Sequence, residues 1–184
     1  MPAFLPQSEK VTLEQYEVLP ENIRAEVFDG VLYNMASPSQ LHQTILLELA
    51  SLLNTCVKQK KGLCQVFIAP FDVKLSDKPL TLVQPDIMIV CEKSKLDGKR
   101  CNGAPDFVVE IVSPSNPEDD YIRKLYYYKN YGVREYWIVD PYSQKVFVYY
   151  LEQEDFKVET YTFRDKIKVN IYDDIWIDFQ NLDL

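Results

Sequence analysis

The pattern of hydrophobic and polar positions, together with capping residues, predicts three helices. Between residues 40 and 60, apolar side chains fall every three or four positions, which is the period of a helix that buries one face. A second helix is predicted over residues 116–131, because it starts with an Asn-Pro cap and first-turn pair and Gly132 follows its end. A short helix is predicted over residues 12–19, where a threonine can cap the start and a proline limits the end.

Shorter runs of β-branched and aromatic residues, separated by turn residues, predict strands. Two of them, 25–29 and 31–35, meet at Asp-Gly, a dipeptide that supplies the positive φ of a hairpin turn. They form a lead-in hairpin. The remaining predicted strands are the core strands 64–69, 71–75, 83–90, 107–112 and 135–139, and an antiparallel series at 145–151, 156–163 and 167–171.

This order of elements predicts the fold class. A helix, several strands, a second helix, a strand and an antiparallel extension form an α/β fold of the mixed α+β kind, in which one mixed sheet is flanked by helices. No linker rich in Gly, Ser or Pro divides the sequence. We therefore expect residues 1–184 to form a single domain, with a core over about 10–150 and an antiparallel C-terminal extension over about 151–184.

Composition narrows the class of protein. With 47% hydrophobic and 26% charged residues, the 184-residue chain can bury a core, which argues against disorder and against a disulfide miniprotein. The net charge of -8 argues against a protein that binds nucleic acid by bulk cationic attraction. Residues 151–184 hold nine acidic and four basic residues, so most of the negative charge lies outside the candidate site described below.

The four cysteines predict neither a zinc site nor a disulfide framework. They are separated by 8, 27 and 10 residues, with no C-x-x-C pair and one histidine in the whole chain. Two disulfides are possible in number, but Cys56 on a helical pattern and Cys91 at a strand end are typical of reduced core thiols. Residues 1–10 lack a basic region followed by an apolar run, and no stretch approaches membrane-spanning length. We expect four reduced cysteines in a cytoplasmic protein without a membrane partner.

Two carboxylates adjoin or interrupt apolar strands. Asp86 follows Gln-Pro just before an apolar run, and Glu110 lies inside the run 107–112. If these strands are neighbours, the two carboxylates at about 4 Å repel by roughly 4 kcal/mol at an effective dielectric of about 20. A divalent cation, a shared proton or a cationic side chain must then hold them, and hard oxygen ligands favour Mg²⁺ or Mn²⁺. The alternative is that Asp86 caps a turn and Glu110 points to solvent.

Several fragments in a fixed order resemble a known family. They are residues 25–30 (AEVFDG), 37–39 (SPS) with His42, 84–86 (QPD), 105–115 (PDFVVEIVSPS), Asp120, Lys124 and Tyr128, and 132–141 (GVREYWIVDP). Over about residues 10–150 the chain resembles the Uma family, also called DUF820, of restriction-endonuclease-like proteins in the PD-(D/E)XK nuclease superfamily.

The resemblance implies a mixed sheet flanked by helices, with acids that hold Mg²⁺ for phosphodiester hydrolysis. By resemblance, Asp86 is the aspartate of the PD motif and Glu110 is its second acid. The chain departs from the motif at Val112, where a lysine would stand two residues after the second acid.

Three further residues are candidates for the site. Lys124 stands four residues after Asp120 and four before Tyr128, so all three share a helix face, and Lys124 is a candidate for the missing cation. The alternative is an ordinary surface pair with Asp120. Glu26, on a lead-in strand, is a candidate third carboxylate or a solvated strand residue. For His42, near a helix start, a core or boundary position is favoured and an active-site role is the alternative.

Basic residues in the loop between the two acid-bearing strands are a candidate contact for a phosphate backbone, with solvated loop charge as the ordinary alternative. They are Lys93, Lys95, Lys99 and Arg100. Tyrosines at 126, 127, 128 and 131 favour packing against a sheet over base stacking.

The leading hypothesis is a metal-dependent endonuclease that hydrolyses DNA phosphodiester bonds. The catalytic candidates are Asp86, Glu110, Lys124, Glu26 and His42, with Mg²⁺ or Mn²⁺ on Asp86, Glu110 and Glu26. The competing hypothesis is a catalytically inactive nuclease fold that acts as a nucleic-acid-binding or protein-interaction module; Val112 and the net charge favour it. By analogy with nucleases that cut two strands, we also expect a homodimer.

Overall fold

The computed structural model describes residues 10–20, 22–114, 118–152 and 157–183. Within these residues the strands form three sheets, with the orders β11-β10-β9-β8-β6-β3, β2-β1-β5-β4-β7 and β12-β13. The mixed α+β class expected from the sequence is confirmed, with mixed sheets flanked by helices. The expectation of one sheet is wrong, because the strands before and after Pro85 pair with different partners.

The helices begin and end close to the predicted positions. Thr12 caps the first helix in a capping box with Gln15, and Ser39 caps the long helix. Gly132 ends the last long helix with φ 93°, while its predicted Asn116 cap lies outside the described residues. The helical elements are α1 (Leu13–Glu17), α2 (Gln40–Gln59), η1 (Lys93–Lys95), the π-helical η2 (Asp119–Lys124), α3 (Leu125–Tyr131) and η3 (Phe179–Asn181).

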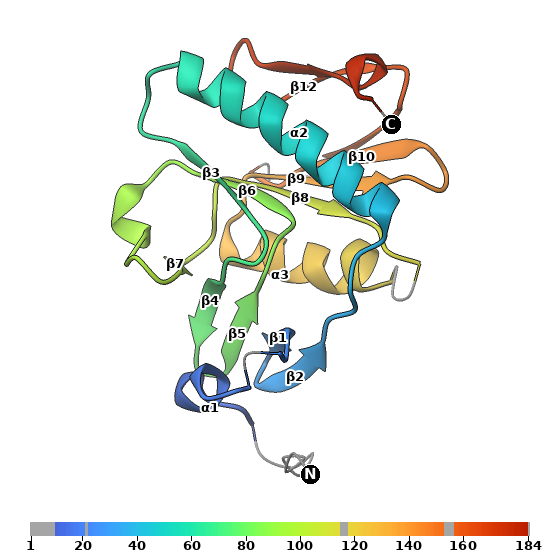
Figure 1. The fold of residues 1–184 in the computed structure, drawn as a ribbon. Coiled ribbons are helices and arrows are strands. Elements are labelled where there is room, and N and C mark those ends of the chain that lie inside the picture. Colours follow the sequence, from blue (N-terminus) through green and yellow to red (C-terminus); the bar gives the residue numbers. More distant parts are fainter. Residues whose placement is uncertain (1–9, 21, 115–117, 153–156, 184) are drawn as a thin grey trace.

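The six-stranded sheet is the centre of the fold. Its strands are β3 (Gln65–Ile68), β6 (Ile87–Val90), β8 (Phe107–Ile111), β9 (Glu135–Asp140), β10 (Lys145–Tyr150) and β11 (Lys157–Thr162). β8 and β9 are parallel, and the other neighbours are antiparallel. In Figure 1, α2 lies above this sheet and α3 below it. The central strands β6 and β8 are buried along their whole length, as their continuous apolar runs predict.

Side chains of the central strands alternate between the two helix layers. Val109 and Ile111 belong to the apolar cluster under α2, whereas Val108 and Val112 belong to the cluster that contains tyrosines of α3. Glu110 has the same parity as Val108, so its side chain points toward the α3 side of the sheet. Strand period therefore sets the direction in which this carboxylate points.

The five-stranded sheet lies beside the α3 side and brings the N-terminal hairpin to the core (Figure 1). Its hairpin turns at Asp29 and Gly30, with φ of 50° and 79°, as the Asp-Gly pair predicted. The predicted strand 83–90 is wrong as a single element: β5 ends at Val83, and β6 begins at Ile87 in the other sheet. The strands are β1 (Ala25–Phe28), β2 (Val31–Asn34), β4 (Val73–Asp77), β5 (Leu80–Val83) and β7 (Cys101–Asn102).

The C-terminal residues cover the α2 side. The predicted strand 167–171 does not continue the antiparallel series: β12 (Lys166–Lys168) pairs instead with β13 (Trp176–Asp178), a strand that the sequence pattern did not indicate. Ile167, Ile177 and Phe179 are buried in the same apolar cluster as the inner face of α2. This hairpin therefore completes the core that holds α2 in place.

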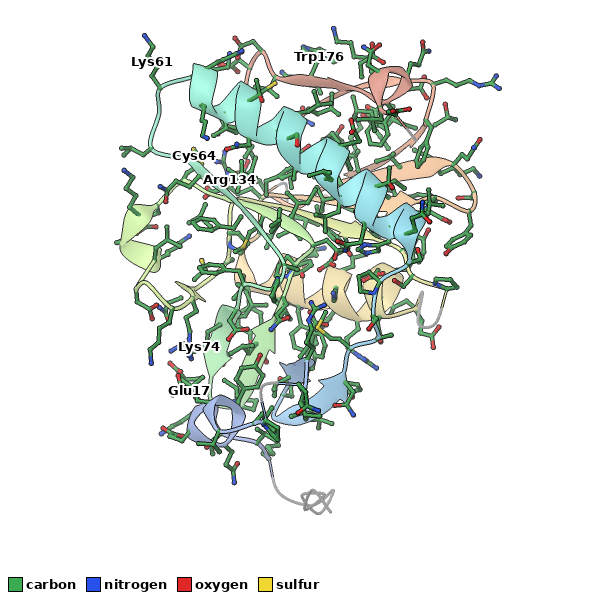
Figure 2. All side chains as sticks on the ribbon, in the orientation of Figure 1. Glu17, Lys61, Cys64, Lys74, Arg134 and Trp176 are labelled. Carbon is green, nitrogen blue, oxygen red and sulfur yellow. A yellow bond between two sulfur atoms is a disulfide. The ribbon has the colours of Figure 1, made fainter. Side chains whose placement is uncertain are left out.

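The expectation of four reduced cysteines is wrong. Cys64 and Cys91 form a disulfide, while Cys56 and Cys101 are free. Cys64, labelled in Figure 2, directly precedes β3, and Cys91 directly follows β6. Because β3 and β6 are antiparallel with Gln65 opposite Val90, the register places the two cysteines opposite each other. Only the strand pairing could reveal this, since the cysteines are 27 residues apart in sequence.

In the part of the chain that the structure describes, no helix combines the length and the apolar character needed to cross a membrane.

Candidate active site

Asp86 and Glu110 come together through the pairing of β6 with β8. Ile87 is opposite Val109 in this antiparallel pair, and the same register, extended by one residue, sets Asp86 opposite Glu110. The backbone N–H of Ile111 donates to Oδ2 of Asp86 at 2.8 Å, which anchors the aspartate to the end of β8. The sequence-based prediction that the two acids belong to neighbouring strands is confirmed.

Glu26 reaches the same place from the other sheet. It lies in β1, is 6% exposed, and its Oε1 accepts a 2.8 Å hydrogen bond from the backbone N–H of Gln84. Gln84 stands two residues before Asp86, so this bond fixes the segment that leads from one sheet into the other. Glu26 is therefore a buried residue at the junction of the sheets rather than a solvated strand residue.

Lys124 is the cation that joins Glu26, Glu110 and Asp120. Its Nζ lies 3.0 Å from Oε1 of Glu110, 3.2 Å from Oε1 of Glu26 and 3.7 Å from Oδ1 of Asp120. The lysine is 5% exposed, so these pairs are screened little by water. The sequence alternative, a surface pair of Asp120 with Lys124, is wrong because both side chains are buried and the lysine contacts two further carboxylates.

Tyr128 adds a neutral donor to the cluster. Its hydroxyl donates to Oε1 of Glu110 at 2.6 Å, and the side chain is fully buried. Burial raises the pKa of Tyr128 well above its ordinary value, and the Glu110 charge raises it further, so the hydroxyl keeps its proton. One oxygen of Glu110 thus receives both the Lys124 ammonium and the Tyr128 hydroxyl.

The charges of the cluster follow from burial and from mutual contact. Burial raises the pKa of Glu110 well above its ordinary value, although Lys124 opposes the rise. Burial also raises the pKa of Asp120 to about 7, against the same lysine. For Lys124, burial lowers the pKa, but Glu110, Glu26 and Asp120 outweigh it and the pKa lies well above its ordinary value. Lys124 therefore remains a positive charge at neutral pH.

His42 lies on the other side of Asp86. Its backbone N–H donates to the N-cap Ser39 in the first turn of α2, and its Nε2 lies 3.0 Å from Oδ2 of Asp86. The ring is buried, and its Nδ1 has no hydrogen-bond partner among the described residues. His42 is therefore a buried residue, as favoured from the sequence, that also contacts a candidate acid.

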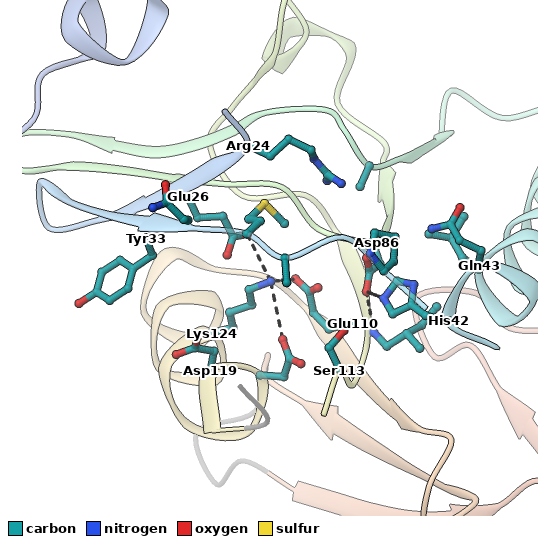
Figure 3. A pocket seen from close by; sticks show the side chains of 18 of the residues that line it. Arg24, Glu26, Tyr33, His42, Gln43, Asp86, Glu110, Ser113, Asp119 and Lys124 are labelled. Atoms are coloured by element: carbon teal, nitrogen blue, oxygen red, sulfur yellow. Dashed lines mark hydrogen bonds and ion pairs between the residues drawn. The ribbon is translucent and has the colours of Figure 1, made fainter. Parts of the chain in front are cut away.

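These side chains line one pocket, drawn in Figure 3. Every catalytic candidate named from the sequence borders it. They are Glu26, His42, Asp86, Glu110 and Lys124. The pocket lies where the end of the central sheet, the N-terminal hairpin, α2 and η2 meet. Its acidic lining and its single buried lysine indicate a site for a cation or for a ligand that brings one.

Comparison with known proteins identifies the family. Residues 13–180 match the family model Uma2, which is described as "Putative restriction endonuclease". The chain belongs to the Uma2 family. The resemblance inferred from the sequence motifs is thereby confirmed.

This Uma2 chain is also similar to one curated protein and to one solved structure. It is 24% identical over 164 residues to the uncharacterized protein slr1290 of Synechocystis sp., an alignment that covers 87% of this chain and 85% of that protein. It is also similar to the crystal structure of a putative nuclease belonging to DUF820 from Anabaena variabilis, with a TM-score of 0.76 and 22% identity, over 94% of this chain and 97% of the other. The structural likeness supports the fold assignment.

The side chains present fit the metal expected for a Uma2 nuclease only in part. Among the described residues, no group of three or more His, Cys, Asp or Glu side chains is arranged to hold a metal ion. Glu26, one of the three predicted ligands, already uses Oε1 for Lys124 and for Gln84. Glu110 likewise uses Oε1, for Lys124 and Tyr128, and Asp86 uses Oδ2, for Ile111 and His42, so each of the three acids keeps one oxygen outside these bonds. Such oxygens fit a hard cation such as Mg²⁺, because Mg²⁺ is commonly held by one or two carboxylates plus water and substrate phosphates.

Sequence reasoning missed parts of this arrangement. The tyrosine pattern predicts packing for Tyr128, although its spacing of four residues from Lys124 was a signal that it shares the lysine's face. Arg24, two residues before Glu26, also lines the pocket. Two of the four basic loop residues are engaged elsewhere: Lys95 donates to the Ala104 carbonyl at 2.9 Å, and Arg100 is buried against Glu17.

Proposed function

We propose that this Uma2 protein is a divalent-metal-dependent endonuclease that hydrolyses DNA phosphodiester bonds. The observation that carries the proposal is the convergence of Asp86, Glu110 and Lys124 from three elements on one pocket, with Glu26 beside them. Burying several charges lowers stability unless they are well paired, and such clusters are typical of functional sites. The printed descriptions, "Putative restriction endonuclease" for the Uma2 family and "putative nuclease" for the Anabaena protein, point to the same reaction class.

The charge balance of the cluster supports a divalent cation. Asp86, Glu26, Glu110 and Asp120 face one ammonium, that of Lys124. When all four acids are ionised, the excess of negative charge favours either protonation or a bound cation. In the proposal Asp86 and Glu110 hold Mg²⁺ or Mn²⁺, which when bound supplies a polarised water and positive charge at the scissile phosphate. Glu26 as a third ligand stays a prediction.

The side chains around the two ligands have distinct tasks in the proposed reaction. His42 and the N–H of Ile111 both engage Oδ2 of Asp86, which orients the aspartate and leaves Oδ1 outside these two bonds. Tyr128 orients Glu110 through its Oε1. Lys124, held protonated by its acidic neighbours, supplies a fixed positive charge that favours the negative charge developing on an attacked phosphate.

Cleavage of plasmid and linear DNA by the full chain, with Mg²⁺, Mn²⁺ or EDTA, tests the proposal. We expect cleavage with either metal and none with EDTA. Asp86→Asn is expected to abolish it, because the change removes a ligand charge while keeping the shape of the side chain. Calorimetric titration with Mg²⁺ gives a readout that is independent of turnover, and the same substitution should remove the binding heat.

Lys124→Met tests the proposed cation. The change keeps the length of the side chain and deletes its charge, so we expect magnesium-dependent cleavage to fall about a hundredfold. The matched control is Lys129→Met on the exposed side of α3, which lies outside the pocket lining and should retain activity. Equal activity of the two variants would contradict the role given to Lys124.

Stability is measured in parallel, because Lys124 is buried. Removing it leaves Glu26 and Glu110 without their cation, which is expected to destabilise the fold by about 3–5 kcal/mol near neutral pH. Adding Glu26→Gln should restore part of that stability, since one of the unpaired carboxylates is then gone. Denaturant unfolding of the single and double variants checks this and separates lost folding from lost chemistry.

The competing function is a catalytically inactive module that binds nucleic acid or protein. Val112 favours it, because the residue lies in the apolar cluster beside Tyr128 and brings no cation to the site. The inactive module would be the better assignment if the unsubstituted chain cleaves no DNA with either metal and shows no heat of metal binding. The homodimer, the cytoplasmic location and the single domain over residues 1–184 stay predictions.

A further inference from the structure

Arg24 is a cation that lines the candidate active-site pocket and has no task in the reaction proposed above. It directly precedes β1 and lines the same pocket as Asp86 and Glu110. In Figure 3, Arg24 lies at the upper side of the drawn pocket and Lys124 at the lower side, with Glu26 and Asp86 at heights between them. The backbone carbonyl of Arg24 accepts from the N–H of Met35 at 2.9 Å, so its position is fixed by the end of the N-terminal hairpin.

The guanidinium of Arg24 has unmet hydrogen-bonding capacity. Its Nε is buried and has no hydrogen-bond partner in the described part of the chain. Its one hydrogen bond there, from Nη2 to Oε1 of Gln84, is long at 3.4 Å and goes to a neutral amide. A buried donor without an acceptor is uncommon in folded proteins and indicates a partner that is absent from the chain itself.

Arg24 lies in a pocket that is lined by acidic side chains, where an ion pair would be expected. Among the described residues Arg24 forms no ion pair, although five carboxylates line its pocket. Other arginines of the chain do pair with acids: Arg100 with Glu17, Arg123 with Asp119, and Arg134 with Asp106 and Glu152. The charge of Arg24 is therefore available to a ligand, whereas that of Lys124 is shared among three carboxylates.

We propose that Arg24 binds a non-bridging phosphate oxygen of the DNA substrate, on the side of the pocket opposite Lys124. This inference rests on the proposed nuclease function. A guanidinium presents its N–H donors in a planar fork that matches phosphate oxygens, and Arg24 lines the pocket without an ion pair among the described residues. A phosphodiester approaching five carboxylates is repelled, so binding needs a cation that the protein has not already neutralised. Arg24 meets that need at the binding step, whereas Lys124 shares its charge with three carboxylates and is assigned to the charge that develops during the reaction.

A purely structural role for Arg24 is the competing explanation, since it contacts Gln84. Gln84 is already held by shorter bonds: its N–H donates to Glu26 at 2.8 Å, and its Nε2 donates to Asp72 at 2.9 Å and to Tyr16 at 3.2 Å. The amide therefore does not depend on Arg24 for its position. A structural role would change stability, whereas phosphate binding changes DNA affinity and its salt dependence.

Arg24→Gln and Arg164→Gln form the matched pair for the test. Both remove one positive charge, and Arg164 is exposed on the turn between β11 and β12, outside the pocket. Fluorescence anisotropy of a labelled DNA duplex is measured at several salt concentrations with Mg²⁺ and with Asp86→Asn added to each chain to prevent cleavage. The KM of cleavage and its salt dependence are measured in the chains that keep Asp86. Thermal unfolding of each variant checks the fold.

Arg24→Gln is expected to weaken DNA binding roughly tenfold, or to raise KM by a similar factor. The salt slope, which is the dependence of the logarithm of the binding constant on the logarithm of the salt concentration, should become less steep by the amount due to about one phosphate contact. Arg164→Gln should do neither, and Arg24→Lys should keep most of the salt slope because it keeps the charge. Cleavage by the unsubstituted chain with affinity, KM and salt slope unchanged in Arg24→Gln would overturn the inference and leave the nuclease proposal standing. Absence of cleavage in the unsubstituted chain with Mg²⁺ or Mn²⁺ would overturn both.

Discussion

At the scale of single residues, the site depends on where each charge is buried and what it contacts. Glu110 could be singled out from the sequence because a carboxylate inside a strand that is apolar on both faces must be buried, and burying an unpaired charge costs free energy. Its two donors, Lys124 and Tyr128, come from a segment that follows it by 14 and 18 residues. The helical spacing of these donors was visible in the sequence, but the oxygen they share was not.

Glu135 is a further buried carboxylate, outside the cluster around Lys124, and it contributes to a pH dependence of stability. It accepts from Nε1 of Trp137 at 2.7 Å and from the N–H of Ile171 at 3.1 Å. Burial raises its pKa to about 7, although these hydrogen bonds oppose the rise. The folded state therefore binds the proton more tightly than the unfolded state, whose pKa is near 4.5. Stability falls as the pH rises from about 4.5 to about 7.

Glu135→Gln should remove part of this decline. One carboxyl group with such a raised pKa lowers the free energy of unfolding by roughly 3 kcal/mol across that pH window. Asp120, with its pKa also raised to about 7 by burial, acts in the same direction and remains in the variant. Urea unfolding between pH 4.5 and 8 measures the free energy of unfolding of both chains. Glu152→Gln, at an exposed carboxylate, is the control. A wild-type stability that rises over this window would contradict the prediction.

At the scale of elements, two local features place the site, and neither was predicted from the sequence. Pro85 lacks a backbone donor, and the chain leaves one sheet after Val83 and enters the other at Ile87. This break sets Asp86 at the start of a strand, next to Glu110. The π-helical turn η2, which carries Asp120 and Lys124, has no signature in the hydrophobic period, because the side-chain pattern of its flanks is that of an ordinary helix.

Gly132 gives a prediction for the end of α3. Its φ of 93° lies in the left-handed region, and its N–H donates to the carbonyl of Tyr128. Gly132→Ala is expected to lower the free energy of unfolding by about 1 kcal/mol through backbone strain. Steric clash does not contribute, because an added Cβ would meet no atom within 4 Å. Gly62→Ala is the control, since its Cβ would also meet open space but its φ is not positive. Equal denaturation midpoints for the two variants would count against this account of the helix end.

At the scale of the whole molecule, the pocket exists because two sheets meet. The N-terminal hairpin supplies Glu26 and Arg24, the central sheet supplies Asp86 and Glu110, and η2 supplies Lys124. The C-terminal hairpin supports the arrangement indirectly by packing against α2, whose first turn carries His42. The site is thus assembled from segments that are distant in the sequence.

The disulfide gives a prediction for the intact molecule. Thiol titration of the denatured, non-reduced chain should count two groups, Cys56 and Cys101, and four after reduction. Reduction should lower the free energy of unfolding by about 3 kcal/mol, given the 27-residue separation of Cys64 and Cys91. Denaturant unfolding with and without reductant measures this, and the Cys64→Ala/Cys91→Ala variant should not respond to reductant. Four thiols before reduction would refute the pairing.

The sequence by itself determined most of the local elements and selected the residues that line the candidate site. Caps, glycines and periodicity predicted the hairpin, α2 and the end of α3, because these signals act between residues a few positions apart. The motif residues Asp86, Glu110 and Lys124 could be selected because carboxylates and a lysine in these settings match a known family.

Tertiary structure alone decided which of these parts meet. The division of the strands between sheets, the Cys64–Cys91 pair and the Arg24 guanidinium without a carboxylate partner all depend on registers between distant segments. Such registers are set by the packing of whole faces, where a shift of one residue reverses every side chain of a strand. No local pattern carries that information, so Asp86 and Glu110 could be proposed as partners from the sequence, but the arginine beside them could not.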